Sequence, residues 1–228
     1  MAGKRLTRIL DKIAAGNGRS SSEQLCEVSA QVVGVSGAGL MLMAGEVRGT
    51  LRSTNEVSNY LEELQFTLGE GPCVDAYRSD SAAIEPDLGR PAVPRWMAFS
   101  PPALAAGVRA VFGFPLRVGG ARLGALDLYR DEPGTLTGEQ HADALVMADV
   151  IARWVLDVQA GAAPGQLADQ LELGADFHFV VHNAAGMVSA QLESNTAEAL
   201  IRLRAYAYSN DFLLRDVAQA VVDRILRF

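Results

Sequence analysis

The sequence RAVFGFPLRVGGARLGALDLYRD, residues 109 to 131, carries the strongest strand signal in the chain. Two runs rich in β-forming residues flank Gly119-Gly120, a dipeptide that readily takes up the positive φ angles of a tight hairpin turn. A second hairpin is predicted upstream in AGLMLMAGEVRGTLRST, residues 38 to 54, with a turn at Ala44-Gly45-Glu46. Two hairpins of this kind predict a sheet that is largely antiparallel.

Helices are predicted on both sides of these hairpins in the chain. The spacing of apolar residues predicts one helix near residues 6 to 13 and another from a cap at Ser20 to Ser22 through Val33. A third begins at Asn55 and is ended by the Gly69-Glu70-Gly71-Pro72 cluster. A fourth, long helix begins at a capping box formed by Thr137 and Gln140.

Shorter elements are predicted between these helices. Pro72 suits the first position of a short helix, because that position needs no amide donor. Residues 82 to 84 have the composition of a short strand, and five prolines between residues 86 and 107 break any helix there into pieces. We therefore expect an irregular, broken wall on one side of the sheet.

A change of pattern divides the chain after the long helix. Residues 161 to 165 read Gly-Ala-Ala-Pro-Gly, which disfavours a continuing helix, and only helical patterns follow. These patterns cover about 166 to 192, 195 to 208 and 212 to 227. The predicted domains are residues 1–160, a linker at 161–166, and residues 167–228. The predicted fold is an α/β (α+β) sandwich with a mostly antiparallel sheet, followed by an all-α module of three helices.

Composition argues against several classes of protein. The net charge of −7 argues against a protein that coats nucleic acid by long-range attraction. No apolar run approaches the roughly 18 residues of a membrane span, and no secretory signal begins the chain, so we expect a soluble, cytoplasmic protein without membrane contact. Cys26 and Cys73 show no metal-binding spacing and are expected to be buried thiols.

The C-terminal stretch HNAAGMVSAQLESNTAEALIRLRAYAYSNDFLLRDVAQAVVDRILRF, residues 182 to 228, resembles an ANTAR domain. The resemblance rests on an Ala-x-Gly on a long helix, Glu-Ala, Leu-Arg, a further alanine and a closing apolar helix. The matching positions are Ala184, Gly186, Glu198, Ala199, Leu203, Arg204, Ala207, Val217, Ala218, Val221 and Val222. Many ANTAR domains carry a basic residue inside the first motif, where this chain has Ala185.

Residues from about 20 to 160 resemble the GAF domains that accompany ANTAR modules in actinobacterial regulators. The motifs that carry the resemblance are Leu-Gly-Glu-Gly-Pro-Cys at 68 to 73, Arg95-Trp96, Gly107-Val108-Arg109, Phe114-Pro115-Leu116 and Leu123-Gly124-Ala125-Leu126. The resemblance implies a sensor domain that controls a homodimeric RNA-binding regulator. Such a regulator binds paired hairpins in a nascent transcript and prevents transcription termination.

RNA contacts are expected from side chains that stack on bases or bond to splayed bases and phosphates. Arg202 and Arg204 lie about 200° apart around a helix, so they cannot serve one flat contact equally. The candidates for RNA contact are His182, Asn183, Arg202, Arg204, Tyr208 and Arg215. For each of them a solvated surface or a capping role is the competing explanation.

An effector pocket in the first domain is a further expectation, although the same side chains could simply fill the core. The candidate lining residues are Met41, Met43, Cys73, Trp96, Phe99, Phe112, Phe114 and Tyr129. The effector itself, if there is one, is an unknown small molecule, because a fold alone does not name a ligand.

Catalysis and metal binding are not expected. Cys73 follows Gly-Pro at a helix start, where amide dipoles can lower a thiol pKa, so a thiol reductase is one alternative, with a packed thiol favoured over it. His178 and His182 are one helical turn apart but lack a third ligand, so no metal site and no cofactor are predicted. The other alternative is an adaptor whose helical module binds a protein partner instead of RNA.

Overall fold

The computed structural model describes residues 2–15, 21–44, 47–162, 168, 171, 176–210 and 212–228. The helices are α1 (Ala2–Ala14), α2 (Ser22–Val33), α3 (Glu56–Leu68), α4 (Pro72–Ser79), α5 (Ser100–Ala105), α6 (Gly138–Ala160), α8 (Asp176–Leu192), α9 (Thr196–Ser209) and α10 (Leu214–Val222). The strands are β1 (Gly37–Ala44), β2 (Val47–Ser53), β3 (Ala83–Glu85), β4 (Ala110–Val118) and β5 (Ala121–Arg130).

The five strands form one sheet in the order β2-β1-β5-β4-β3, and the pairs are antiparallel. The predicted antiparallel sheet and both hairpins, β1-β2 and β4-β5, are therefore confirmed. Gly119 takes φ 58° in the β4-β5 turn, as a tight hairpin requires. The turn residues 45 and 46 of the other hairpin lie outside the described residues.

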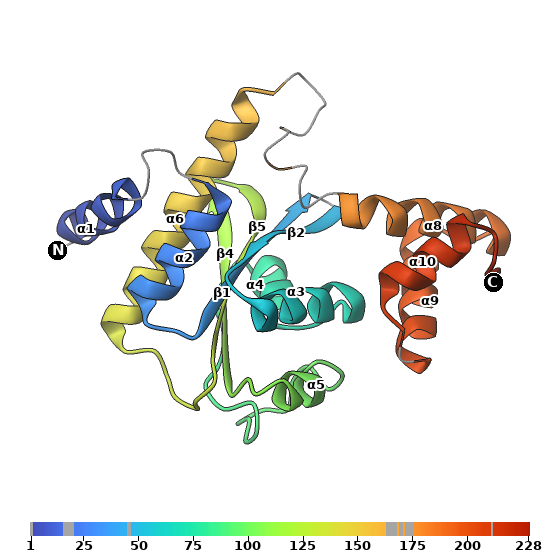
Figure 1. Cartoon of the computed structure of the whole chain (residues 1–228), viewed down its shortest axis with the longest axis horizontal. Coiled ribbons are helices and arrows are strands. Elements are labelled where there is room, and N and C mark those ends of the chain that lie inside the picture. Colours follow the sequence, from blue (N-terminus) through green and yellow to red (C-terminus); the bar gives the residue numbers. More distant parts are fainter. Residues whose placement is uncertain are drawn as a thin grey trace.

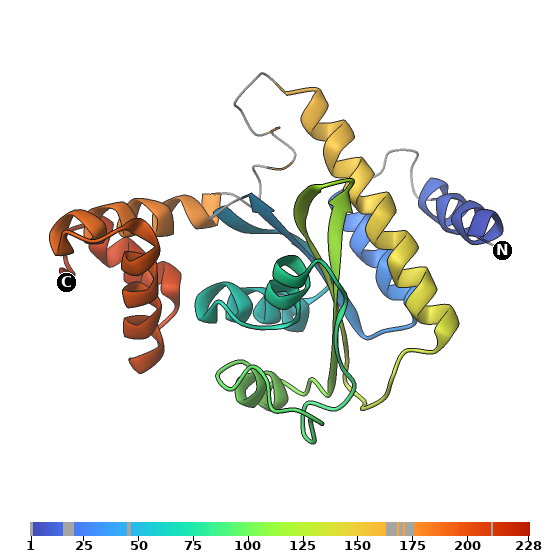
Figure 2. The same ribbon diagram turned by 180° about the vertical axis from the view of Figure 1, so that it is seen from behind.

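Helices cover both faces of the sheet, as Figures 1 and 2 show from opposite sides. Helices α2 and α6 pack on one face, where the predicted capping box of α6 is present at Thr137 and Gln140. Helices α3 and α4 pack on the other face, and α5 lies below them in Figure 1. The sheet is thus the middle layer of an α/β sandwich.

Strand alternation assigns each side chain to a face. On β5, Leu126 and Leu128 belong to the core under α2 and α6, whereas Ala125 and Tyr129 belong to the core under α3 and α4. Position 127 therefore faces α3 and α4. This alternation decides which groups can meet at the candidate site.

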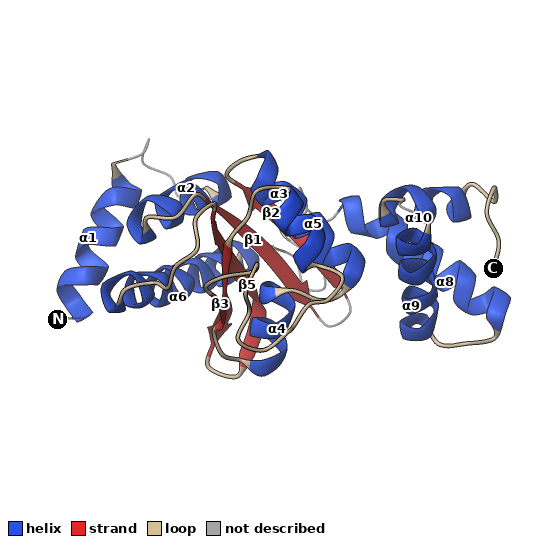
Figure 3. Ribbon diagram, turned by 90° about the horizontal axis from the view of Figure 1, so that it is seen from below, coloured by secondary structure: helices blue, strands red, loops and turns tan. Residues whose placement is uncertain are grey.

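The three C-terminal helices lie beside the sandwich, at the end where α3 and β2 reach them (Figure 3). Their own core joins α8, α9 and α10 and also includes Phe66 of α3. Helix α9 contacts α3, and α8 contacts β2. The helical module and the sheet domain therefore share a packed contact.

Two predicted helix ranges need correction or remain untested. The last helix was predicted over 212 to 227 but ends at Val222, because Arg224 takes φ 61° and the chain folds back. The amides of Ile225 and Leu226 then bond to the Ala220 carbonyl at 2.8 and 2.9 Å. Most of the predicted helix start between 166 and 175, with part of the linker, lies outside the described residues.

None of the described helices is both long and apolar enough to cross a membrane.

Candidate functional site

The loop between α3 and α4 is built from the Leu-Gly-Glu-Gly-Pro-Cys motif. Gly69 caps α3 in the left-handed conformation with φ 68°, and Gly71 has φ 133°, which side chains rarely adopt. Pro72 then occupies the start of α4, so the chain turns sharply and places Cys73 in the first turn of that helix. The motif thereby fixes α3 and α4 side by side over the sheet.

Glu70 binds the proline-rich segment, residues 86 to 107, to this loop. Its Oε1 accepts hydrogen bonds from the backbone amides of Ala98 at 2.6 Å and Phe99 at 2.8 Å. The indole Nε1 of Trp96 donates to Asp75 on α4 at 2.8 Å. The proline-rich segment is therefore joined to the loop and to α4 by specific hydrogen bonds.

Two carboxyl groups and one thiol meet beneath this loop. Glu62 of α3, Cys73 of α4 and Asp127 of β5 each offer a potential ligand atom, and these atoms all lie within 4.8 Å of one another. Glu62 and Cys73 have no exposed surface, and Asp127 is 3% exposed. We call Glu62, Cys73 and Asp127 the acidic cluster.

Gln65 connects two members of the acidic cluster. Its Nε2 donates to Asp127 Oδ2 at 2.6 Å, and its Oε1 accepts the backbone amide of Cys73 at 2.7 Å. Gln65 lies within a turn of Glu62 on α3, and it is fully buried as well. One amide side chain thus orients both the carboxylate and the helix start that carries the thiol.

The remaining polar atoms of the cluster are not satisfied. Among the described residues, neither oxygen of Glu62 has a hydrogen-bond partner, and Asp127 Oδ1 has none. Burial, together with the charge of Asp127, raises the pKa of Glu62 well above its usual range. Burial also raises the pKa of Asp127 to about 7, and it raises the pKa of the Cys73 thiol.

The direction of the Cys73 shift bears on the reductase alternative. A helix start can lower a thiol pKa, but here burial and the neighbouring Asp127 and Glu62 outweigh the amide dipoles and raise it. Both cysteines are buried and free, as predicted for packed thiols. Burial and the two neighbouring carboxyl groups therefore favour the protonated thiol of Cys73 in the metal-free protein.

Glycines in the sheet make room for the cluster. In the strand register Asp127 stands opposite Gly39 of β1 and Gly113 of β4. A β-carbon at Gly39 would lie 2.1 Å from Glu62 Oε1, and one at Gly113 would lie 2.3 Å from the Pro72 carbonyl oxygen. The row Gly39-Asp127-Gly113 lets α3 and α4 approach the sheet closely.

Of the predicted pocket residues, six lie in the core around the cluster and two do not. The six are Met41, Met43, Cys73, Trp96, Phe99 and Tyr129. Phe112 and Phe114 belong to the opposite core, under α2 and α6, because alternation on β4 points both away from α3 and α4. Including these two phenylalanines in a single pocket was wrong.

The predicted RNA contacts are spread over three helices. Asn183 of α8, Arg202 and Tyr208 of α9 and Arg215 of α10 are exposed. Arg202 forms an ion pair with Glu198 at 3.3 Å. Arg215 forms one with Asp216 at the same distance.

Arg204 and His182 are partly buried instead. The Arg204 guanidinium lies 6.0 Å from the ring centre of Phe66, and a β-carbon at Gly69 would come within 3.0 Å of its Nη1. Arg204 therefore lies at the contact between α9 and α3. A candidate RNA contact is located where the helical module meets the sheet domain.

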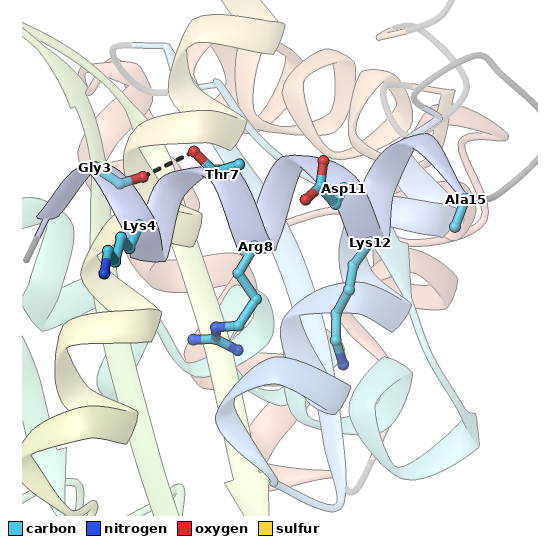
Figure 4. A pocket seen from close by; sticks show the side chains of 7 residues that line it. All are labelled: Gly3, Lys4, Thr7, Arg8, Asp11, Lys12 and Ala15. Carbon is cyan, nitrogen blue, oxygen red and sulfur yellow. Dashed lines mark hydrogen bonds between the residues drawn. The ribbon is translucent and has the colours of Figure 1, made fainter.

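A basic face on α1 is the other surface of interest. Figure 4 shows Lys4, Arg8 and Lys12 along one side of this helix, next to Asp11. Arg8 pairs with Asp143 of α6 at 2.6 Å, and Ile9 and Ile13 are buried. The hollow beside this face is lined by residues 3 to 15, and its contact with α6 is the ion pair of Arg8, so the face is a packed helix surface and not a built site.

Comparison with known proteins identifies the sheet domain. A family model described as "GAF domain" matches residues 21–152, more than half of the chain. A GAF domain of a phosphoenolpyruvate-protein phosphotransferase from Coxiella burnetii matches at 14% identity and TM-score 0.51, covering 70% of this chain and 95% of that one. A domain of a sensor histidine kinase protein from Sinorhizobium meliloti matches at 14% identity and TM-score 0.51, covering 60% and 90%.

A GAF domain of the corresponding Acinetobacter phosphotransferase is similar at 13% identity, covering 70% of this chain and 96% of its own, with TM-score 0.51. At these identities the likeness shows the fold alone. No curated protein matches the chain.

Proposed function

Because this chain belongs to the GAF domain family, whose members act in signal sensing, we propose that it is a signal-responsive RNA-binding regulator of transcription termination. In this proposal the GAF domain receives the signal, and helices α8, α9 and α10 bind paired hairpins in nascent RNA as an antiterminator. The protein acts as a homodimer, without catalysis. The RNA-binding part rests on the resemblance of residues 182–228 to an ANTAR domain.

The contact at Arg204 carries the link between sensing and RNA binding. Arg204 is the Arg of the Leu-Arg motif, and its guanidinium is held against Phe66 and Gly69 of the GAF domain. Arginine binds RNA through phosphates and by stacking on bases, and both modes need an accessible guanidinium plane. Docking on α3 therefore keeps this side chain from RNA.

A groove lies at the same contact between α3 and α9. We call the arrangement in which α9 packs on α3 the docked state. The groove is lined from the GAF side by Leu64, Thr67 and Leu68, and from the module by Ala207 and Tyr208. A signal that moves α3 would loosen this contact and release Arg204. The regulator would then shift from a docked state to an RNA-binding state, as a two-state equilibrium allows.

The test is binding of the purified full-length protein to an RNA with two short hexaloop hairpins, across a salt series. We expect binding that requires both hairpins and weakens as salt rises. Arg204→Ala should weaken it about tenfold and reduce the salt dependence by about one phosphate contact. The matched control is Arg153→Ala, which removes the same charge from the exposed face of α6.

The docking step has its own pair of variants. Thr67→Lys places a long side chain in the groove and should raise RNA affinity by displacing α9. Asn59→Lys adds the same charge to an exposed position of α3 outside that groove and should raise it less. Equal effects of the two lysines would mean that added charge, not undocking, changes the affinity.

A protein-partner adaptor is the second candidate, and exposed apolar side chains on the helical module favour it. Ile201, Phe212 and Phe179 are more than half exposed. An adaptor predicts no RNA binding at any salt concentration by a folded full-length protein. That result would remove the antitermination proposal and leave the GAF assignment untouched.

A further inference from the structure

No counter-charge for the acidic cluster is found among the described residues. Glu62 has no exposed surface, Asp127 is 3% exposed, and no basic side chain is among the groups that shift their pKa values. A buried carboxylate without hydrogen bonds or a paired cation is strongly destabilised. Three unsatisfied oxygens from two carboxyl groups, aimed at one thiol, therefore need an explanation beyond packing.

We propose that Glu62, Cys73 and Asp127 bind one divalent transition-metal ion, with Zn²⁺ as the best fit. The proposal goes beyond the RNA-binding function and does not depend on it. A thiolate excludes Mg²⁺ and Ca²⁺, which prefer oxygen ligands only, and favours ions of the zinc or iron(II) type. Two carboxylates and one thiolate supply three protein ligands, so a fourth position is open to water or a small ligand.

The distances fit such an ion with little rearrangement. Zinc lies about 2.3 Å from sulfur and about 2.0 to 2.2 Å from carboxylate oxygen, so tetrahedral ligand atoms are about 3.3 to 3.7 Å apart. The three ligand atoms already lie within 4.8 Å of one another. They need to approach by no more than about 1 to 1.5 Å, which rotation of the Glu62 and Cys73 side chains can supply.

The surroundings match a metal site. Gln65 holds the second oxygen of Asp127 and the Cys73 amide, the kind of outer contact that orients ligands. The unsatisfied atoms are those left to bind the ion, namely Asp127 Oδ1 and the two Glu62 oxygens. Gly39 leaves the space into which the Glu62 carboxylate extends.

The site also lies next to the contact with the helical module. Glu62 and Phe66 are one turn apart on α3, and Phe66 belongs to the core of α8, α9 and α10. An ion that draws Glu62 toward Asp127 pulls on the same helix that docks Arg204. Metal binding at the cluster would therefore act on the helix that contacts the helical module, and this one consequence rests on the proposed function.

The test uses the tag-free, full-length protein, stripped with a chelator and titrated with Zn²⁺ and with Co²⁺ as a spectroscopic probe. We expect one equivalent per chain and a sulfur-to-cobalt charge-transfer band. Cys73→Ser should abolish the band, and Glu62→Gln and Asp127→Asn should each weaken binding by more than about tenfold. Cys26→Ser is the matched control, because Cys26 is equally buried but lies in the core on the other side of the sheet, and it should keep the band.

X-ray absorption on the wild-type zinc complex answers the same question without relying on a variant that folds. It should show one sulfur at about 2.3 Å with oxygen neighbours. Clearly substoichiometric metal, a band that survives Cys73→Ser, or a zinc environment without sulfur would overturn the proposal. These readouts contain no RNA, so their failure is separate from failure of the RNA-binding function.

Discussion

The sheet face under α2 and α6 and the face under α3 and α4 bury polar groups in different ways. On the first face Ser29 donates to the Leu25 carbonyl at 2.6 Å, and Asp143 pairs with Arg5 and Arg8. On the second face Glu62 has no partner among the described residues and Asp127 has one unsatisfied oxygen. Asp143 is 5% exposed and Asp127 is 3% exposed, so the two carboxyl groups differ in their partners and not in their burial.

The polar groups buried on the first face are paired, so their burial is compatible with stability. The unpaired carboxyl groups of the second face cannot be explained in this way. A protein gains nothing by burying unpaired carboxyl groups next to a thiol, since apolar side chains of similar size would pack at lower cost. Natural proteins keep such costly arrangements mainly at functional sites. The comparison therefore supports the proposal that a site lies on the α3 and α4 side of the GAF domain.

The largest predicted effect removes packing from the first face. Phe114 is fully buried there and contacts His141 of α6 edge to face, with ring centres 5.3 Å apart. Phe114→Ala should lower the free energy of unfolding by about 3 to 5 kcal/mol, measured by urea denaturation. The folded variant should bind Co²⁺ as the wild type does, and a comparable loss of metal affinity would break the separation of the two faces.

Next in size are the two glycines beside Asp127. An alanine at Gly113 meets the backbone carbonyl of Pro72, which cannot move without shifting α4, and should cost about 1 to 3 kcal/mol. The atoms nearest to a β-carbon at Gly39 all belong to the Glu62 side chain, which can rotate away, and none of the three is backbone. Gly39→Ala should therefore lose less stability but displace a metal ligand.

Denaturation and cobalt titration together distinguish the two glycine variants. The expected pattern is a less stable Gly113→Ala and a metal-deficient Gly39→Ala. If Gly39→Ala bound cobalt normally, Glu62 would not be a ligand in the way proposed.

A smaller effect concerns pH in the metal-free protein. The folded-state pKa of Asp127 is raised from 3.8 to about 7, so between these values the folded state holds a proton that the unfolded state has lost. The free energy of unfolding should then fall as pH rises through this window. The amide introduced by Asp127→Asn cannot ionise. The free energy of unfolding of this variant should therefore fall less than that of the wild type, by about 1 kcal/mol or more.

Denaturation midpoints of both metal-free proteins, measured at pH 5 and pH 8, check this difference. Parallel slopes for Asp127→Asn and the wild type would mean that Asp127 is ionised in the folded protein at both pH values.

Local signals predicted most of the sandwich. The Gly119-Gly120 hairpin, the Asn55 and Thr137 caps and the Gly69 stop all act within a few residues, so sequence patterns reveal them. The end of α10 was missed because Arg224 leaves the helix at a positive φ without a glycine or proline to mark it. The chain beyond Arg224 packs on the other helices, since the Phe228 amide donates to Gln191 of α8 and its ring contacts Tyr206 of α9, and local patterning does not reveal such contacts.

The acidic cluster could not be read from spacing. Its three members come from α3, α4 and β5, and they meet only because the β1-β5-β4 register aligns Asp127 with two glycines. A signal was nevertheless present: Asp127 interrupts the apolar run Leu-Gly-Ala-Leu-Asp-Leu-Tyr, in a strand with both faces covered. A charge at such a position is costly, so it indicates a functional site more strongly than the aromatic residues that suggested a pocket.

The smallest predicted effect removes the buried hydroxyl of the first face. Ser29 bonds to the carbonyl four residues earlier in α2, and that carbonyl keeps its helical partner when the hydroxyl is gone. Ser29→Ala should change the free energy of unfolding by less than about 0.5 kcal/mol, because alanine also has the higher helix propensity. The measurement is urea denaturation beside metal-free Asp127→Asn at pH 8, where only the aspartate variant should gain stability. A loss of more than 1 kcal/mol in Ser29→Ala would show that the first face also depends on its polar groups, and the contrast between the two faces would no longer identify the site.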